Sequence, residues 1–153
     1  MPGYRGKGSA GWRTIGEKSI YYRSRWEANY ARWLEYQRKH GLIATWEHEP
    51  RTFWFSGIRR GVTSYKPDFR FLKVDVDGRE KTEFWVEVKG WMDPKSATKI
   101  KRFKKYFPEH NLIIIDKEWF KSNSAKLRLI IKDWETPHAA CKRQIKKSYF
   151  KQH

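Results

Sequence analysis

The sequence predicts a mixed α/β fold, with the element order αβββαβ and a central mixed sheet flanked by helices. Three observations predict it: helical spacing of apolar residues over 24–40, two β-rich segments joined by Asp77-Gly78, and a second helical segment leading into a short apolar run at 112–115. A chain of 153 residues suits one compact domain with short extensions.

The first helix is expected over residues 24–40, where aromatic and aliphatic residues recur on one face. Gly41 stands where such a helix would end. Ser24 and Glu27 match a Ser-x-x-Glu capping box, in which each side chain accepts from a backbone N–H that the helix start leaves free. The helix should therefore begin at Ser24.

The strands follow this helix. They are expected over residues 43–55, 66–76 and 82–89. Pro50 indicates an edge position or a bend that divides the first segment into two short strands, and residues 56–63 read as a loop. Asp77-Gly78 favours a tight hairpin between the last two strands, which makes them antiparallel neighbours.

A second helix is expected after Asp93-Pro94, which supply an N-cap and a first-turn proline, and it should end at Pro108. The apolar run at 112–115 is typical of a strand buried on both sides and parallel to its neighbour. Residues 127–131 fit either another strand or a helix.

The chain is expected to divide into a flexible basic arm (1–18), one domain (19–136) and a basic tail or helix (137–153). Cys141 is the only cysteine, so an internal disulfide and a cysteine-based zinc site are excluded and a reducing compartment is favoured. No apolar run approaches the roughly 18 residues that cross a bilayer, and the start lacks the apolar stretch of a signal peptide. We expect a soluble, cytoplasmic protein.

The charge indicates a polyanionic partner. The chain has 34 Lys and Arg against 17 Asp and Glu, a formal net charge of +17. Such a surface concentrates polyanions, and DNA is the expected partner. A merely basic soluble protein, or a structural protein of the ribosomal kind, is the alternative that charge alone leaves open.

The chemistry is expected at Asp68, Glu87 and Lys89. Glu87 and Lys89 share one face of their strand, and the hairpin brings Asp68 beside Glu87. Adjacent carboxylates repel each other unless a cation neutralises them. Oxygen ligands without cysteine favour Mg²⁺, with Mn²⁺ as a substitute, over zinc. The alternative is that these charges lie on the solvent face of a hairpin, with Lys89 in a cross-strand ion pair.

A carboxylate-held metal would suit phosphodiester hydrolysis, which needs a hydroxide nucleophile at neutral pH and shielding of the phosphate charge. Lys89 would face the attacking water and the phosphate. Glu47, His48 and Glu49 are interpreted as hairpin surface rather than as a metal site, because alternate residues of a strand face opposite ways.

Together these residues resemble the PD-(D/E)XK nuclease superfamily, with Pro67-Asp68 as its first motif and Glu87-Val88-Lys89 as its second. The resemblance covers about residues 24–116 and implies a restriction-endonuclease-like core that needs Mg²⁺. It also implies that Glu27 completes the metal site and that the Val88 carbonyl is a ligand. For Glu27 the capping role is an equal alternative.

The same resemblance implies that cations of the second helix contact phosphate, although a plain solvated basic face is the alternative. The residues expected to contact DNA are Lys95, Lys99, Arg102, Lys66, Arg23, Arg5, Lys7 and Arg13.

In size and layout the chain is similar to phage-type and archaeal Holliday-junction resolving enzymes, which implies a homodimeric enzyme of DNA recombination acting on four-way junctions or other branched DNA. If phage-encoded, it would act in the host cell cytoplasm. Two alternatives stay open: a nicking, repair or transposase-like end-cutting nuclease, and a non-catalytic nucleic-acid-binding module.

Overall fold

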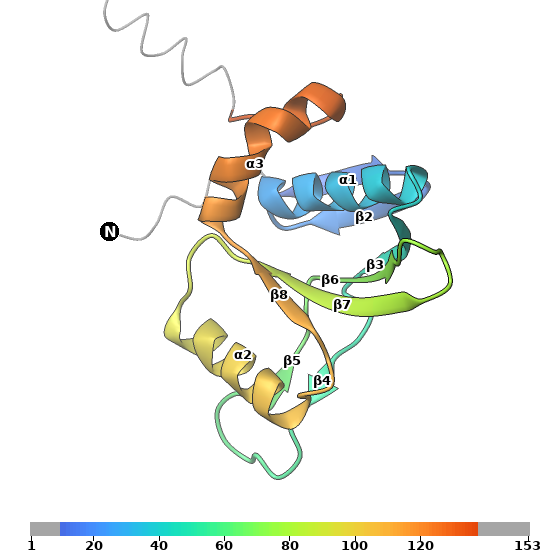
Figure 1. Ribbon diagram of the computed structural model, residues 1–153. Helices are drawn as coiled ribbons and strands as arrows, with labels where there is room; N and C mark the ends of the chain where they lie inside the picture. The colour runs from blue at the N-terminus through green and yellow to red at the C-terminus, as the bar shows by residue number, and fades with distance from the viewer. Residues whose placement is uncertain (1–9, 138–153) are drawn as a thin grey trace, which may run out of the picture.

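The computed structural model describes residues 10–137, which form three helices and three small sheets (Figure 1). In chain order the elements are β1 (Gly11–Ile15), β2 (Lys18–Tyr22), α1 (Arg25–Lys39), β3 (Ile43–His48), β4 (Phe53–Trp54), β5 (Ser64–Tyr65), β6 (Phe69–Val74), β7 (Lys81–Val88), α2 (Pro94–Tyr106), β8 (Leu112–Ile115) and α3 (Lys117–Ile130).

The central sheet has four strands in the order β3-β6-β7-β8. The first three are antiparallel, and β8 runs parallel to β7 after the crossover through α2. The predicted mixed α/β class is therefore confirmed, and the elements of the central sheet follow in the chain order α1, β3, β6, β7, α2 and β8. The two-residue strands β4 and β5 form a separate small sheet.

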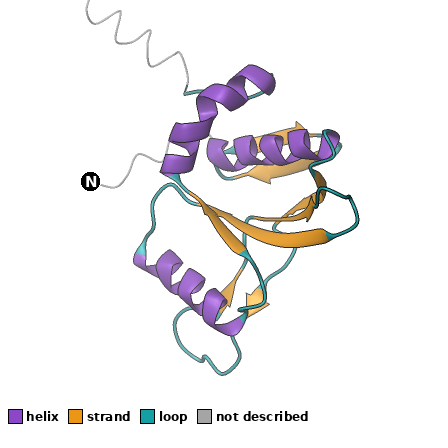
Figure 2. Cartoon of the chain, in the orientation of Figure 1, coloured by secondary structure: helices purple, strands orange, loops and turns teal. Residues whose placement is uncertain are grey.

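Helices cover both faces of this sheet: α1 and α3 lie on one side, and α2 lies on the other beside β4 and β5 (Figures 1 and 2). Each face has its own apolar core. Strand β7 contributes side chains to both cores. Val86 and Val88 face α1, while Trp85 packs with Phe53 and Phe103 on the α2 side. A strand buried on both faces is held firmly, so the residues at its end are well fixed.

The hairpin register places the candidate acidic residues together. Phe69 pairs with Val86, and Gly78 has the positive φ that the predicted turn requires. One further position along this register puts Asp68 opposite Glu87. Directly opposite residues of antiparallel strands point to the same face, here the α2 face that Trp85 also faces.

Helix α1 begins as predicted, with the Ser24 side chain accepting from the N–H of Glu27 at 3.1 Å. The other half of the capping box is not formed. Oε2 of Glu27 instead accepts from the backbone N–H of Arg23 at 3.4 Å. The glutamate thus lies close to the helix start with its carboxylate turned toward the chain that precedes it.

The second half of the domain follows the prediction except in the burial of its last strand. Asp93 caps α2 by accepting from the N–H of Ser96 at 2.8 Å, as expected. Strand β8 is an edge strand in which only Ile115 is fully buried, so the expected burial on both sides was wrong. Residues 127–130, which fitted strand or helix, belong to α3.

The N-terminal segment differs most. Residues 11–22 form the hairpin β1–β2, so the part of the expected flexible arm from residue 10 to 18 was wrong. Ile15 is buried, and Arg13 forms an ion pair with Glu135 at 2.8 Å. Ile15 and Tyr22 of this hairpin belong to the same apolar core as α1, which holds the hairpin against that helix.

The remainder of the arm and the basic tail beyond residue 137 lie outside the described residues. Among the helices of residues 10–137, none combines the length and apolar character that a bilayer-spanning helix needs.

Candidate active site

Asp68 and Glu87, which we call the carboxylate pair, lie side by side where β6 begins and β7 ends. Asp68 is only 9% exposed, and its Oδ2 accepts from the backbone N–H of Val88 at 2.7 Å. Glu87 accepts from the hydroxyl of Tyr65 at 2.7 Å. Within residues 10–137 neither carboxylate forms an ion pair with a Lys or Arg. Two neighbouring acids, Asp68 buried and Glu87 half-buried, thus lie without a partner cation.

The electrostatic result for Asp68 is a pKa well above its usual range. Burial is the largest cause, followed by repulsion from Glu87, then from Glu27 and more weakly from Glu49. The hydrogen bond from Val88 opposes the rise in pKa without cancelling it. The surroundings therefore disfavour the ionised form unless positive charge is added.

Glu87 shows the same direction. Burial raises its pKa, Tyr65, Lys89 and Lys99 act to lower it, and Glu27 raises it again. The net pKa remains above the usual value. The nearby lysines therefore do not neutralise the pair, which argues against the reading in which these acids merely decorate a solvent face.

Lys89 follows Glu87 on the same face but forms its ion pair with Asp93, four residues along, at 3.3 Å. The cross-strand ion pair with Asp68 or Glu87, one of the sequence alternatives, is therefore not formed. Lys89 is still near enough to lower the pKa of Glu87. Its ammonium group stands at the rim of the carboxylate pair.

Glu27 reaches the same region from α1, on the other side of the sheet. It is buried, and its Oε2 lies 3.9 Å from Nε2 of His48. Because Glu27 raises the pKa of both Asp68 and Glu87, it is part of the same electrostatic cluster. Its hydrogen bond to Arg23 does not neutralise it, since that donor is an uncharged backbone N–H.

The interpretation of His48 and Glu49 as hairpin surface was wrong. The His48 side chain is 10% exposed, packs edge-on against Tyr22 and Phe69, and leaves Nε2 buried without a hydrogen bond. Glu49 has a left-handed backbone, with φ of 45°, which re-aims its side chain out of the strand alternation. Of the three residues only Glu47 is exposed.

Glu49 is tied to the candidate site through the backbone. Its N–H donates to the carbonyl of Asp68 at 2.8 Å, and its carboxylate accepts from Arg23 and pairs with Lys66 at 3.0 Å. Glu49 therefore ties the end of β3 to the backbone at Asp68, just before β6 begins, and Pro50 follows where the chain leaves β3. Arg23 and Lys66, expected to contact DNA, both lie at this edge of the site.

Sequence reasoning gave Tyr65 no role. It is buried in the core between the sheet and α2, and both burial and Glu87 raise its pKa, so the hydroxyl stays protonated and donates to Glu87. Its position three residues before Asp68 was visible in the sequence. Tyr65 meets Glu87 because it is held in the small sheet β4–β5. Strands of two residues carry little sequence pattern, so this sheet could not be recognised from the sequence.

The donor set suits a hard divalent cation. Within the described residues, no group of three or more His, Cys, Asp or Glu side chains is arranged to hold a metal ion, so Glu27 does not complete a ligand set with the pair as the three stand. Mg²⁺ commonly binds through one or two carboxylates and keeps several waters. Asp68 and Glu87, both short of positive charge, fit that requirement.

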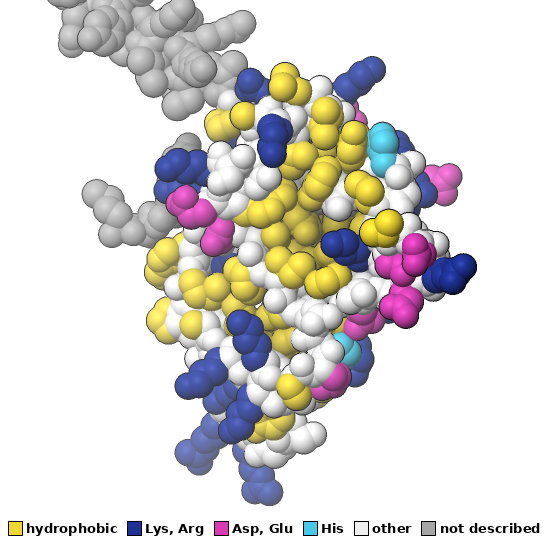
Figure 3. Space-filling model, in the orientation of Figure 1, with side chains coloured by type: hydrophobic (Ala, Val, Ile, Leu, Met, Phe, Trp, Pro, Cys, Tyr) yellow, Lys and Arg dark blue, Asp and Glu magenta, His cyan; other side chains and the backbone are white. Residues whose placement is uncertain are grey.

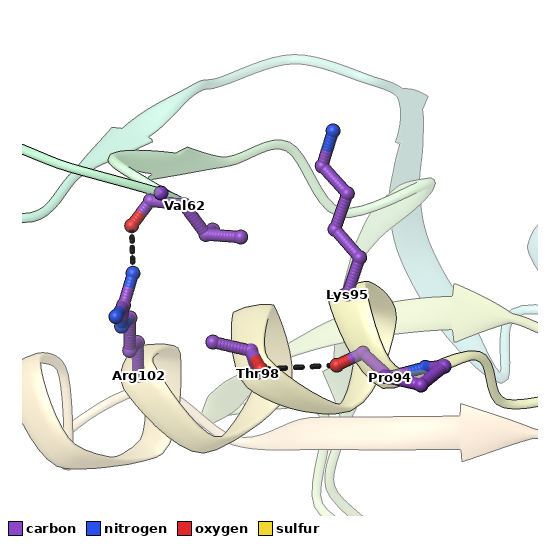
Figure 4. Close-up of a pocket in the computed structure, with 6 residues that line it drawn as sticks. Val62, Pro94, Lys95, Thr98 and Arg102 are labelled. Carbon is purple, nitrogen blue, oxygen red and sulfur yellow. Dashed lines mark hydrogen bonds between the residues drawn. The ribbon is translucent and has the colours of Figure 1, made fainter.

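Cations gather over α2 on the side away from α1 (Figure 3). Lys95, Lys99 and Arg102, the basic face of α2, lie at helical spacing, and two of them, Lys95 and Arg102, bound a pocket beside the segment that carries Val62. In Figure 4, Arg102 donates to the Val62 carbonyl while Lys95 extends into the opening between helix and segment. Lys99 is the member that acts electrostatically on Glu87.

The other expected DNA contacts divide into two groups. Arg13 lies in β1 rather than in a flexible arm and is mostly buried and paired with Glu135, while its expected contact with DNA stays a prediction. Arg5 and Lys7 lie outside the described residues.

Comparison with known proteins gives no assignment: no family model, no curated protein and no solved structure matches the chain.

Proposed function

We propose that the chain is a Mg²⁺-dependent DNA endonuclease with a restriction-endonuclease-like core. The observation that carries the proposal is the carboxylate pair: a buried and a half-buried acid with raised pKa values and no ion pair among residues 10–137, at the end of a rigid strand and beside a basic helix. Such a pair costs stability, and metal binding offsets the cost. A solvated hairpin surface would leave both acids exposed, whereas Asp68 is buried and Glu87 is half-buried.

The roles follow from position. Asp68 and Glu87 would hold the cation, with the Val88 carbonyl as a further oxygen ligand, and Glu27 would add negative charge behind them. When bound, Mg²⁺ shields the phosphate charge and lowers the pKa of a water. Lys89, at the rim, would orient the water and offset charge on the phosphate, exchanging its present partner Asp93 for the substrate.

The basic face of α2 supports DNA as the substrate. Lys95, Lys99 and Arg102 follow the candidate site directly along the chain, and the net charge of +17 favours a polyanion. We propose branched DNA, four-way junctions above all, cut by a homodimer in the cytoplasm. This part rests on the resemblance in size and layout to junction-resolving enzymes, and Mn²⁺ should replace Mg²⁺.

The test compares a four-way junction, a nicked duplex, a linear duplex and a single strand, each with Mg²⁺ and with EDTA. Asp68→Asn and Glu87→Gln should abolish cleavage and leave DNA binding within about threefold, because neither removes a cation. Glu80→Gln is the matched control, the same loss of charge at the exposed far end of the hairpin, and should cut normally.

Each outcome selects one function. Paired incisions in opposite strands of the junction support a resolving enzyme. Equal cutting of every form supports the nicking or repair alternative. If Asp68→Asn and Glu87→Gln both cut at the parental rate, the site is wrongly assigned, and binding without incision under either metal leaves only a binding module.

A further inference from the structure

The turn between β7 and α2 presents an exposed tryptophan beside the candidate site. Trp91 is 74% exposed and stands two residues after Lys89, with Met92, 39% exposed, next to it. Hydrophobic atoms cover the surface over this segment, next to the cations over α2 (Figure 3). A large aromatic left in water costs free energy, so a cluster of this kind marks a binding surface.

The turn is held rigidly at its base. At Gly90 a Cβ atom would lie 2.7 Å from the ring of Trp26, and that ring stacks on Phe120 with centroids 4.6 Å apart. Only glycine allows the backbone to pass this close. The ion pair of Lys89 with Asp93 closes the turn from the other side. Trp91 is thereby directed outward by fixed neighbours on both sides.

The charges around Trp91 fit nucleic acid. Exposed Lys95 and half-buried Lys99 follow on the first turns of α2. The acid closest along the chain, Asp93, is already engaged by Lys89 and by the N–H and hydroxyl of Ser96. An exposed aromatic ring beside lysines is typical of sites where bases stack on the ring and phosphates pair with the lysines. The carboxylate of Asp93 already has partners of its own within the turn.

We propose that Trp91 is a stacking platform for an unpaired base next to the cleaved phosphate, so that the enzyme prefers DNA whose bases are unstacked at a branch, gap or flap. This proposal rests on the proposed function and deepens it. In continuous duplex the bases are already stacked and offer no free face. A branch supplies one without the cost of flipping a base.

A nucleobase is favoured over a second protein copy by charge. The basic face of α2 would lie within the same contact, and two copies meeting there would bring like charges together. DNA supplies the opposite charge instead.

The experiment measures binding of branched and linear DNA of the same sequence in the non-cleaving Asp68→Asn background, with Trp91 intact, changed to Ala or changed to Phe. Trp91→Ala should lower the affinity for branched DNA by about 5- to 150-fold and leave linear duplex almost unchanged. Trp91→Phe should restore most of the loss, since stacking needs an aromatic face rather than the indole N–H.

Matched controls are Trp12→Ala and Trp54→Ala, whose side chains are 71% and 67% exposed on the small sheets β1–β2 and β4–β5. Neither should change the ratio of branched to linear affinity. An equal loss in all three variants, or an unchanged ratio in Trp91→Ala, overturns the proposal. So does a change of sedimentation mass in Trp91→Ala, which would place Trp91 in a contact between copies.

This result is separable from the proposed function. If the unmodified chain cuts no DNA with Mg²⁺, the nuclease assignment fails while the affinity ratio still decides the stacking site. If it cuts but Trp91→Ala keeps the preference for branched DNA, stacking fails and the nuclease stands.

Discussion

The hydroxyl of Tyr65 donates a 2.7 Å hydrogen bond to Oε2 of Glu87. Through this bond the small sheet β4–β5 supports an acid of the central sheet. Tyr65 packs against Phe103 of α2, so its ring cannot turn away freely. The orientation of one candidate metal ligand therefore depends on packing that lies outside the hairpin carrying the ligands.

Removing this bond should weaken metal binding. In Tyr65→Phe the ring still fills the core, but Glu87 loses its donor, and partners of this kind typically change metal affinity 10- to 100-fold. The Mg²⁺ concentration that gives half-maximal cleavage should rise accordingly, and calorimetric titration with Mn²⁺ should show the same shift. Tyr106→Phe, on an exposed ring, is the control. An unchanged metal dependence would show that Tyr65 only packs.

Neutralising Asp68 should stabilise the metal-free protein. Burial and Glu87 raise its pKa, so the folded chain binds a proton more tightly than the unfolded chain does. The stability from that proton is present below the unfolded pKa, close to 3.8, and is lost as pH rises through the folded pKa. In EDTA at neutral pH, Asp68→Asn should melt a few degrees higher than the parent.

This gain in melting temperature should vanish below about pH 4, where Asp68 of the parent is protonated as well. Mg²⁺ should raise the melting temperature of the parent and leave that of Asp68→Asn nearly constant, because only the former binds it. An Asp68→Asn variant less stable than the parent in EDTA at pH 7 would contradict the electrostatic account of the pair.

The basic face of α2 should set the salt dependence of DNA binding. Each of Lys95→Ala and Lys99→Ala should weaken binding of all sequences alike and reduce the slope of log affinity against log salt by about 1. Fluorescence anisotropy of labelled DNA, in EDTA and from 50 to 300 mM salt, measures this slope. Lys81→Ala, at the other end of β7, should leave the slope unchanged. If Lys81→Ala changes the slope and the α2 variants do not, DNA follows another face.

Protonation of Glu135 at low pH should lower the stability of the folded protein. Burial opposes its ionisation, but hydrogen bonds from Arg13 and Arg32 outweigh this effect and lower its pKa. The stability that the carboxylate contributes is present above the unfolded pKa and lost as pH falls through the folded pKa. Because the side chain is 31% exposed, Glu135→Gln should cost only about 1 to 2 kcal/mol at pH 7.

Chemical denaturation at pH 7 and at pH 3 tests this, since the difference between Glu135→Gln and parent should shrink at the lower pH. A constant difference would mean that the carboxylate adds no pH-dependent stability.

The sequence predicted what depends on local pattern. Helical spacing and the caps Ser24 and Asp93 located α1 and α2, and Asp77-Gly78 set the register that places Asp68 opposite Glu87. These predictions succeed because capping and turn geometry act within a few residues.

Contacts between distant segments could not be predicted in this way. His48 faces Glu27 because α1 and β3 pack together, and Tyr65 meets Glu87 through a sheet of two-residue strands. The positive φ of Glu49 breaks the alternation on which the sequence argument relied. The hairpin β1–β2 was missed since its stability comes from burial of Ile15 rather than from its glycine-rich composition.

The contact of Glu135 with Arg13 brings the two limits of the described chain to neighbouring points. Domains with adjacent ends tolerate circular permutation. A linker of about six residues between positions 11 and 136, with a new opening at the exposed Gly78 turn, would then reorder the chain while keeping the ion pair intact. The opening would fall at the far end of the hairpin from Asp68 and Glu87, so the two acids of the pair would come from opposite ends of the reordered chain.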